Sequence, residues 1–226
     1  TAAIHGKLYC YIEQSSKHTL ADIVVDEDVF LAHGQRCLLR RPSPAANYGS
    51  LRFLGFADYK LRARDSDEMQ WWLQQIDLIN NPAELLLHIL NKNTGQAQTV
   101  VQLCRSLSYS PRAMRELLDA QVAEKNVQAT SADSYVAVGE AQGILDVLDA
   151  TVQHFCSKNS NRLRIPMSLL RQQVGKKSWP VVASFSNEML AQVNLKVSKG
   201  EYWTIINVEV DKQFAASADH LVALLV

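Results

Sequence analysis

The clearest chemical signal in this sequence is a run of basic side chains between residues 158 and 177. Six lysines and arginines occur there with no aspartate or glutamate between them. Such side chains suit contacts to the phosphates of a nucleic acid. A solvated charged surface is the alternative, because runs of charge often face only water. The candidate nucleic-acid-binding residues are Lys158, Arg162, Arg164, Arg171, Lys176 and Lys177.

Signatures of catalysis and metal binding are missing from the sequence. Gly175-Lys176-Lys177-Ser178 resembles the end of a P-loop, but Leu170 stands where the first glycine is required, and the segment follows no predicted strand. His154 and Cys156 are two residues apart on a predicted helix and therefore face different directions. The sequence predicts no catalytic residue, no metal site and no cofactor in this chain.

The basic run falls within a predicted unit of three helices and a β-hairpin. Helices are expected over 141–156, from Pro166 onward, and between 179 and 190. Two short alternating runs around a Lys-Gly turn, 193–197 and 202–206, predict a hairpin. This order is typical of a winged-helix domain, and Trp203 on the second hairpin strand is the aromatic residue to consider for a base contact.

A similar order precedes it, from about residue 82 to 138. Asn81-Pro82-Ala83-Glu84 and Ser110-Pro111 are helix starts, each with a capping residue before a proline. Arg112 and Arg115 stand early in the helix that would enter a nucleic-acid groove. Acidic residues follow them closely, so this helix is predicted to serve packing rather than nucleic-acid contact.

The first 65 residues are predicted to form short β-strands. Alternating or apolar runs over 8–12, 21–26, 29–31, 36–40 and 51–56 are separated by turn residues, including Asn47-Tyr48-Gly49, and favour part of a small β-barrel. A helix should begin at Ser66. The predicted domains are a partial barrel (1–65), a linking helix with a first winged helix (66–139), a second winged helix (140–210), and the start of a further helix or winged helix (211–226). We therefore expect an α+β multidomain chain with further strands upstream.

Composition narrows the class of protein. Hydrophobic residues make up 47% of the chain, which is enough for packed cores, and 23 basic residues balance 23 acidic ones. Binding to nucleic acid by bulk charge is therefore disfavoured, and only a local surface could provide it. The four cysteines lack the spacing of a zinc ribbon or a disulfide-rich secreted domain. No apolar run is long enough to cross a membrane. A cytoplasmic protein with reduced thiols is the expectation.

In the order of its parts, the chain resembles the C-terminal half of the bacterial selenocysteine-specific translation elongation factor. The segments that carry the resemblance are Gly6-Lys7-Leu8, Ala21–Asp26, Gly34–Arg40, the basic stretch with Lys60, Arg62 and Arg64, the linking helix with Gln70-Trp71-Trp72-Leu73, and the tandem winged helices. The family often has a Gly-Gly pair in its last barrel strand, where this chain has Arg52-Phe53-Leu54-Gly55.

The resemblance implies a monomeric factor that delivers selenocysteyl-tRNA to the ribosome at a recoded UGA. GTP and Mg²⁺ would bind in a GTPase domain upstream, and a later winged helix would grip the mRNA hairpin. The two winged helices here would be spacers, with the basic run as a site of RNA contact. Two alternatives stay open, namely a tandem winged-helix DNA-binding regulator and a winged-helix protein-interaction scaffold.

Overall fold

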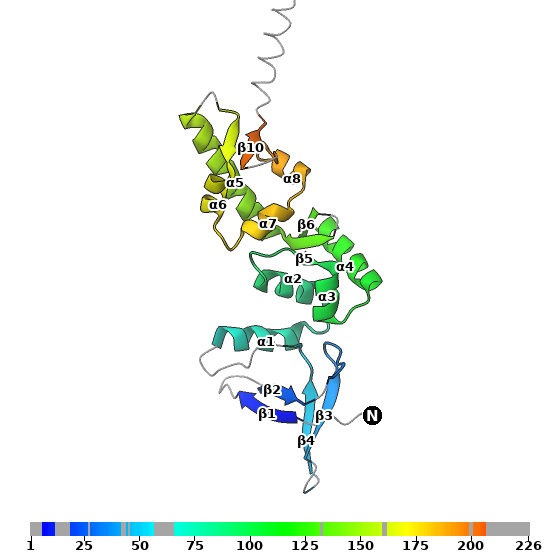
Figure 1. The fold of residues 1–226 in the computed structure, drawn as a ribbon. Helices are drawn as coiled ribbons and strands as arrows, with labels where there is room; N and C mark the ends of the chain where they lie inside the picture. The colour runs from blue at the N-terminus through cyan, green and yellow to red at the C-terminus, as the bar shows by residue number, and fades with distance from the viewer. Residues whose placement is uncertain are drawn as a thin grey trace, which may run out of the picture. The chain divides into compact units, whose positions relative to one another are not determined.

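The computed structural model describes residues 6–11, 19–26, 28–41, 44, 46–56, 66–131, 133–159, 162–198 and 201–206. These residues form a mixed α+β fold with eight helices and four small antiparallel sheets (Figure 1). The chain divides into two compact units, Thr1–Ile89 with Val100–Gln121, and Leu90–Thr99 with Val122–Val226. The stretch 211–226, expected to begin a further helix, and the basic residues Lys60, Arg62 and Arg64 lie outside the described residues.

The N-terminal strands form two separate antiparallel pairs. They are β1 (Gly6–Tyr11) with β2 (Leu20–Val25), and β3 (Arg36–Arg41) with β4 (Ala46–Arg52). Tyr11 donates a hydrogen bond from its hydroxyl to Asp22 Oδ2 (2.8 Å) within the first pair. The closed barrel predicted from the sequence stays a prediction.

Three details of this region differ from the sequence-based expectation. The strand expected over 51–56 ends at Arg52, and Gly55 beyond it has a positive φ of 153°. The apolar run 29–31 is not a strand, because none of the strands that the structure describes pairs with it, and Phe30 is 97% exposed. The turn expected at 47–49 lies inside β4. An irregularity in the pairing at Leu39/Arg40, together with a positive φ of 148° at Gly49, lets the strand continue through these turn-prone residues.

Helix α1 (Ser66–Leu78) begins where the sequence predicted and packs on β2 (Figure 1). Trp71 stacks on His88 of α2 (Pro82–Lys92), with ring centroids 5.0 Å apart and planes 8° from parallel. His88 Nε2 lies 3.0 Å from the Trp71 carbonyl oxygen. These contacts join α1 to α2 within the first compact unit.

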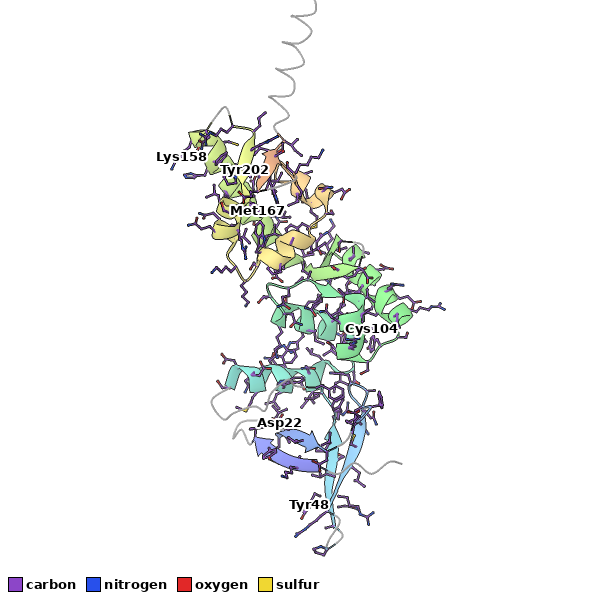
Figure 2. The ribbon with its side chains drawn as sticks, viewed as in Figure 1. Asp22, Tyr48, Cys104, Lys158, Met167 and Tyr202 are labelled. Atoms are coloured by element: carbon purple, nitrogen blue, oxygen red, sulfur yellow. The ribbon has the colours of Figure 1, made fainter. Side chains whose placement is uncertain are left out.

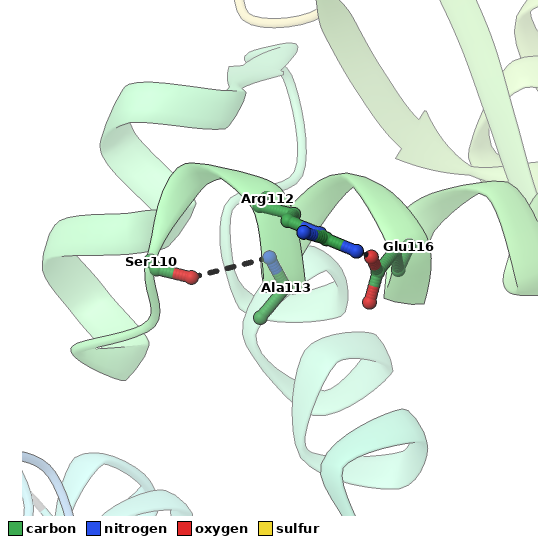
Figure 3. Close-up of polar contacts among 4 residues, drawn as sticks. All are labelled: Ser110, Arg112, Ala113 and Glu116. Atoms are coloured by element: carbon green, nitrogen blue, oxygen red, sulfur yellow. Dashed lines mark hydrogen bonds and ion pairs between the residues drawn. The ribbon is translucent and has the colours of Figure 1, made fainter.

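The predicted helix starts of the first repeat, Pro82–Ala137, are confirmed. Asn81 Oδ1 accepts from the Glu84 amide at the start of α2 (3.4 Å), and Ser110 Oγ accepts from the Ala113 amide at the start of α4 (3.2 Å; Figure 3). Such caps satisfy amides that have no partner within the helix. The elements after α2 are β5 (Gln98–Thr99), α3 (Val100–Leu107), α4 (Pro111–Ala123), β6 (Val127–Ser131) and β7 (Ser134–Ala137).

The second repeat, Val138–Ile205, has the same order of elements, except that its third helix is in two pieces. The predicted helix over 179–190 breaks at Phe185, which is extended, and restarts behind Ser186, whose Oγ accepts from the Met189 amide (3.3 Å). The elements are α5 (Val138–Lys158), β8 (Arg164–Pro166), α6 (Met167–Val174), α7 (Trp179–Ser184), α8 (Asn187–Ala191), β9 (Leu195–Lys196) and β10 (Tyr202–Ile205).

The two repeats have sheets of the same connectivity. In the first, the strand order is β5-β7-β6, and in the second it is β8-β10-β9. In both, the last strand in sequence lies at the centre, and the short strand before the second helix lies at one edge. The sequence did not predict these edge strands of two and three residues, since they are too short to show an alternating pattern.

The second compact unit has one continuous apolar core. Buried residues of α5, α6, α7 and α8 pack with the inner face of β8, β9 and β10, and Val136 of β7 joins them. Trp203 and Trp179 meet there, with ring centroids 5.8 Å apart. Ser184 Oγ donates to Thr130 Oγ1 (2.9 Å), which joins α7 to β6. This core fixes the elements that carry the basic run.

Candidate nucleic-acid interface

All six predicted nucleic-acid-binding side chains are exposed and belong to the second compact unit. Lys158 is the last residue of α5 (Figure 2). Arg162 lies just before β8, and Arg164 is its first residue. Arg171 lies on α6, and Lys176 and Lys177 lie between α6 and α7.

The six side chains are spread over the unit rather than gathered in a compact cluster. Lys177 Nζ donates to Thr94 Oγ1 (3.1 Å). Gly95, the residue after Thr94, donates its amide to the carboxylate of Glu140 in the first turn of α5. Lys158 is eighteen residues after Glu140 on α5, which is about 27 Å at 1.5 Å per residue. Lys158 and Lys177 therefore mark opposite ends of α5, and Arg171 lies on the helix packed beside it. We call these six side chains the basic row.

Most charges in the basic row are unpaired. Among the residues that the structure describes, no carboxylate forms an ion pair with any of the six, and Lys177 bonds only to a hydroxyl. A cation that is exposed and not already neutralised keeps its full attraction for a phosphate, and it releases condensed counterions when it binds one. Each of these exposed cations is therefore available for contact with a phosphate.

The third helices of the repeats carry weaker features for binding phosphate. On α4, Arg112 Nε pairs with Glu116 Oε1 at 2.9 Å, in a position where both side chains are exposed (Figure 3). On α8, hydrogen bonds from the backbone and from Ser186 lower the pKa of the exposed Glu188, which keeps this first-turn carboxylate ionised. An acid at a helix N-terminus occupies the place that a phosphate would take.

Trp203, the aromatic residue chosen from the sequence, is buried in the core, at 5% exposure. Its neighbour Tyr202 is on the opposite face of β10 and is 48% exposed. Lys196, which is not among the six predicted residues, is on the same outer face of the sheet. The alternation Tyr-Trp-Thr-Ile was the signal that separates the two faces, but it does not say which face is inside.

Histidines and cysteines form no candidate metal site in the described parts of the chain. No three His, Cys, Asp or Glu side chains there are grouped so as to hold a metal ion. Burial lowers the pKa of His33, and a hydrogen bond with Gln75 (3.0 Å) opposes that effect in part.

None of the helices described, including the 21-residue α5, is long and apolar enough to cross a membrane.

Comparison with protein-family models finds no family that matches this chain, and comparison with curated proteins finds no significant relative. The features of this chain that bear on function are the order of its elements and the basic row.

Proposed function

We propose that this chain is part of a GTP-dependent translation elongation factor that delivers selenocysteyl-tRNA to the ribosome at recoded UGA codons. Residues 1–65 belong to the third barrel domain of its tRNA-binding body. The two repeats are winged-helix domains that link this body to the end of the protein that binds the mRNA hairpin. GTP and Mg²⁺ bind in a GTPase domain upstream of this segment, and the factor acts as a monomer in the cytoplasm.

The observation that carries this proposal is the duplicated topology. Both repeats run helix, short strand, helix, helix, hairpin, and both place the last strand between the other two. This order of elements supports a winged-helix interpretation, in which the hairpin would be the wing. Paired strands and a linking helix precede the duplicated part, as the proposed order of domains requires.

The surface chemistry of the third helices supports a spacer over a DNA-binding regulator. A recognition helix has to offer unpaired donors to a groove. On α4, Glu116 pairs with Arg112 Nε and offsets part of the charge nearest the helix start. Helices α7 and α8 are short pieces, and α8 has Glu188 in its first turn. The basic row lies outside these helices, where it suits contacts to the phosphates of a folded RNA.

The reading frame that encodes this segment tests the identity of the parent protein. We expect a GTPase domain with a G-x-x-x-x-G-K-[ST] loop before residue 1 and at least one more winged-helix unit after residue 226. Sequencing the frame on both sides gives the answer directly. A parent without a P-loop contradicts the proposal and leaves a regulator or a protein-interaction scaffold.

The basic row is tested by removing charge at its two ends. Arg162→Ala with Arg164→Ala, and Lys176→Ala with Lys177→Ala, should each weaken binding to a structured RNA hairpin. Together they should lower the slope of log affinity against log salt by about 3, because each lost phosphate contact removes close to one released counterion. Fluorescence anisotropy at several salt concentrations measures this.

The matched control is Arg105→Ala with Arg112→Ala, which removes the same charge from exposed positions of the first repeat. This control variant should leave the slope of log affinity against log salt unchanged. An unchanged slope in the four-residue variant contradicts RNA contact by the row and favours the scaffold.

A further inference from the structure

The three-stranded sheet of the second repeat has two faces of opposite character. Ile165, Trp203 and Leu195 point into the core, with exposures of 0%, 5% and 0%. The residues that alternate with these along each strand form the outer face. Paired residues on neighbouring strands share a face, so the register Arg164↔Thr204↔Lys196 makes one row across that face, and Tyr202↔Pro166 makes the next.

The outer face combines an aromatic ring with two cations. Tyr202 is 48% exposed, and within the described residues its hydroxyl has no hydrogen-bond partner. Arg164 and Lys196 are exposed on the two edge strands. The central Thr204 hydroxyl bonds to Ser198, so short side chains fill the middle and the ring stands above them.

The spacing brings the three groups within reach of one ligand. Arg164 and Lys196 are two strand spacings apart, or about 10 Å, with Thr204 between them. Tyr202 is two residues from Thr204 on the central strand and diagonal to Arg164, which places it about 7–8 Å away. No residue of β8, β9 or β10 is acidic.

We propose that this outer face binds single-stranded RNA, with one unpaired base stacked on Tyr202 and flanking phosphates on Arg164 and Lys196. The inference deepens the proposed function, on which it rests, by assigning an unpaired segment of RNA to the sheet. An aromatic platform beside cations is the arrangement that single-stranded nucleic acid requires, because every base has a face to stack and every nucleotide carries a charge. Two unpaired cations beside one exposed ring would attract a protein partner only if that partner were acidic.

The test measures binding of a fluorescent twelve-nucleotide oligouridylate to the full 226-residue chain. Tyr202→Ala should lower the affinity about tenfold, within the range that loss of one stacked base produces, whereas Tyr202→Phe should retain it. Arg164→Ala with Lys196→Ala should lower the salt slope by about 1.4. The matched control is Tyr48→Ala, which removes another exposed tyrosine that is next to an arginine, Arg41 (3.4 Å; Figure 2).

The hairpin RNA used for the basic row is measured in parallel. Unchanged oligouridylate binding in Tyr202→Ala, or an equal loss in Tyr48→Ala, overturns the base-stacking site. If the hairpin still depends on the basic row in that case, the proposed function stands without it. A wild-type chain that binds neither RNA contradicts both.

Discussion

Replacing Trp203 with alanine should destabilise the second compact unit by about 4 kcal/mol, the largest effect we expect from a single substitution. Trp203 is on the central strand of its sheet, is 5% exposed, and packs against Trp179 and the apolar side chains of α5 to α8. Its removal costs the transfer free energy of a large aromatic side chain and leaves a cavity that the regular elements around it cannot fill completely.

Hydrogen exchange measures this effect separately in each part of the chain, because two compact units need not unfold together. Amides of α5 and α6 should exchange much faster in Trp203→Ala, whereas those of α1 should not change. The control is Tyr202→Ala at the next position of the same strand. Since Tyr202 faces solvent, its truncation should cost less than about 1 kcal/mol. Equal losses at the two positions would contradict the two-faced sheet and, with it, the proposed RNA surface.

The helix starts were predictable because their signals are local. Asn81-Pro82 and Ser110-Pro111 each combine a capping side chain with a proline in the first turn, and the structure shows both caps. A cap acts within four residues, so tertiary contacts have little chance to override it. The start of α1 at Ser66, with two acids in its first turn, belongs to the same class.

Features that depend on distant partners were not predictable. The edge strands β5 and β8 exist only because β7 and β10 lie beside them. The turn-like residues Asn47–Gly49 form a strand because β3 supplies hydrogen bonds along that length. The helix expected over 179–190 breaks at Phe185, whose side chain is buried in the core. In each case packing or pairing outweighs local preference.

The candidate site shows the same division. The exposure of the six basic residues could be predicted from the sequence because charged side chains are mostly exposed. The layout of these residues could not be predicted. A twenty-residue run suggests a cluster, whereas α5 separates Lys158 from the loop with Lys177. The choice between Trp203 and Tyr202 depended on which face of β10 meets the core, and alternation alone leaves that open.

Gly95→Ala should destabilise the second compact unit by about 3 kcal/mol, for two reasons that can be separated. Gly95 has a φ of +91°, which L side chains rarely adopt. A Cβ there would also lie 2.6 Å from the Lys177 carbonyl oxygen, so the backbone between α6 and α7 would have to move. That movement would disturb the bond from the Gly95 amide to Glu140 and the bond between Lys177 and Thr94.

Two other glycines provide matched controls for thermal or denaturant unfolding. Gly175 has a φ of 87° and a ψ of 155° with open space around it, so Gly175→Ala carries backbone strain without the clash and should cost about 2 kcal/mol. Gly143 is exposed in the middle of α5 with nothing near it, so Gly143→Ala should stabilise the chain by up to about 1 kcal/mol. If Gly95→Ala costs no more than Gly175→Ala, the close contact with Lys177 does not limit this loop. Lys176 and Lys177, at the α6–α7 end of the basic row, would then be free to move independently of α5.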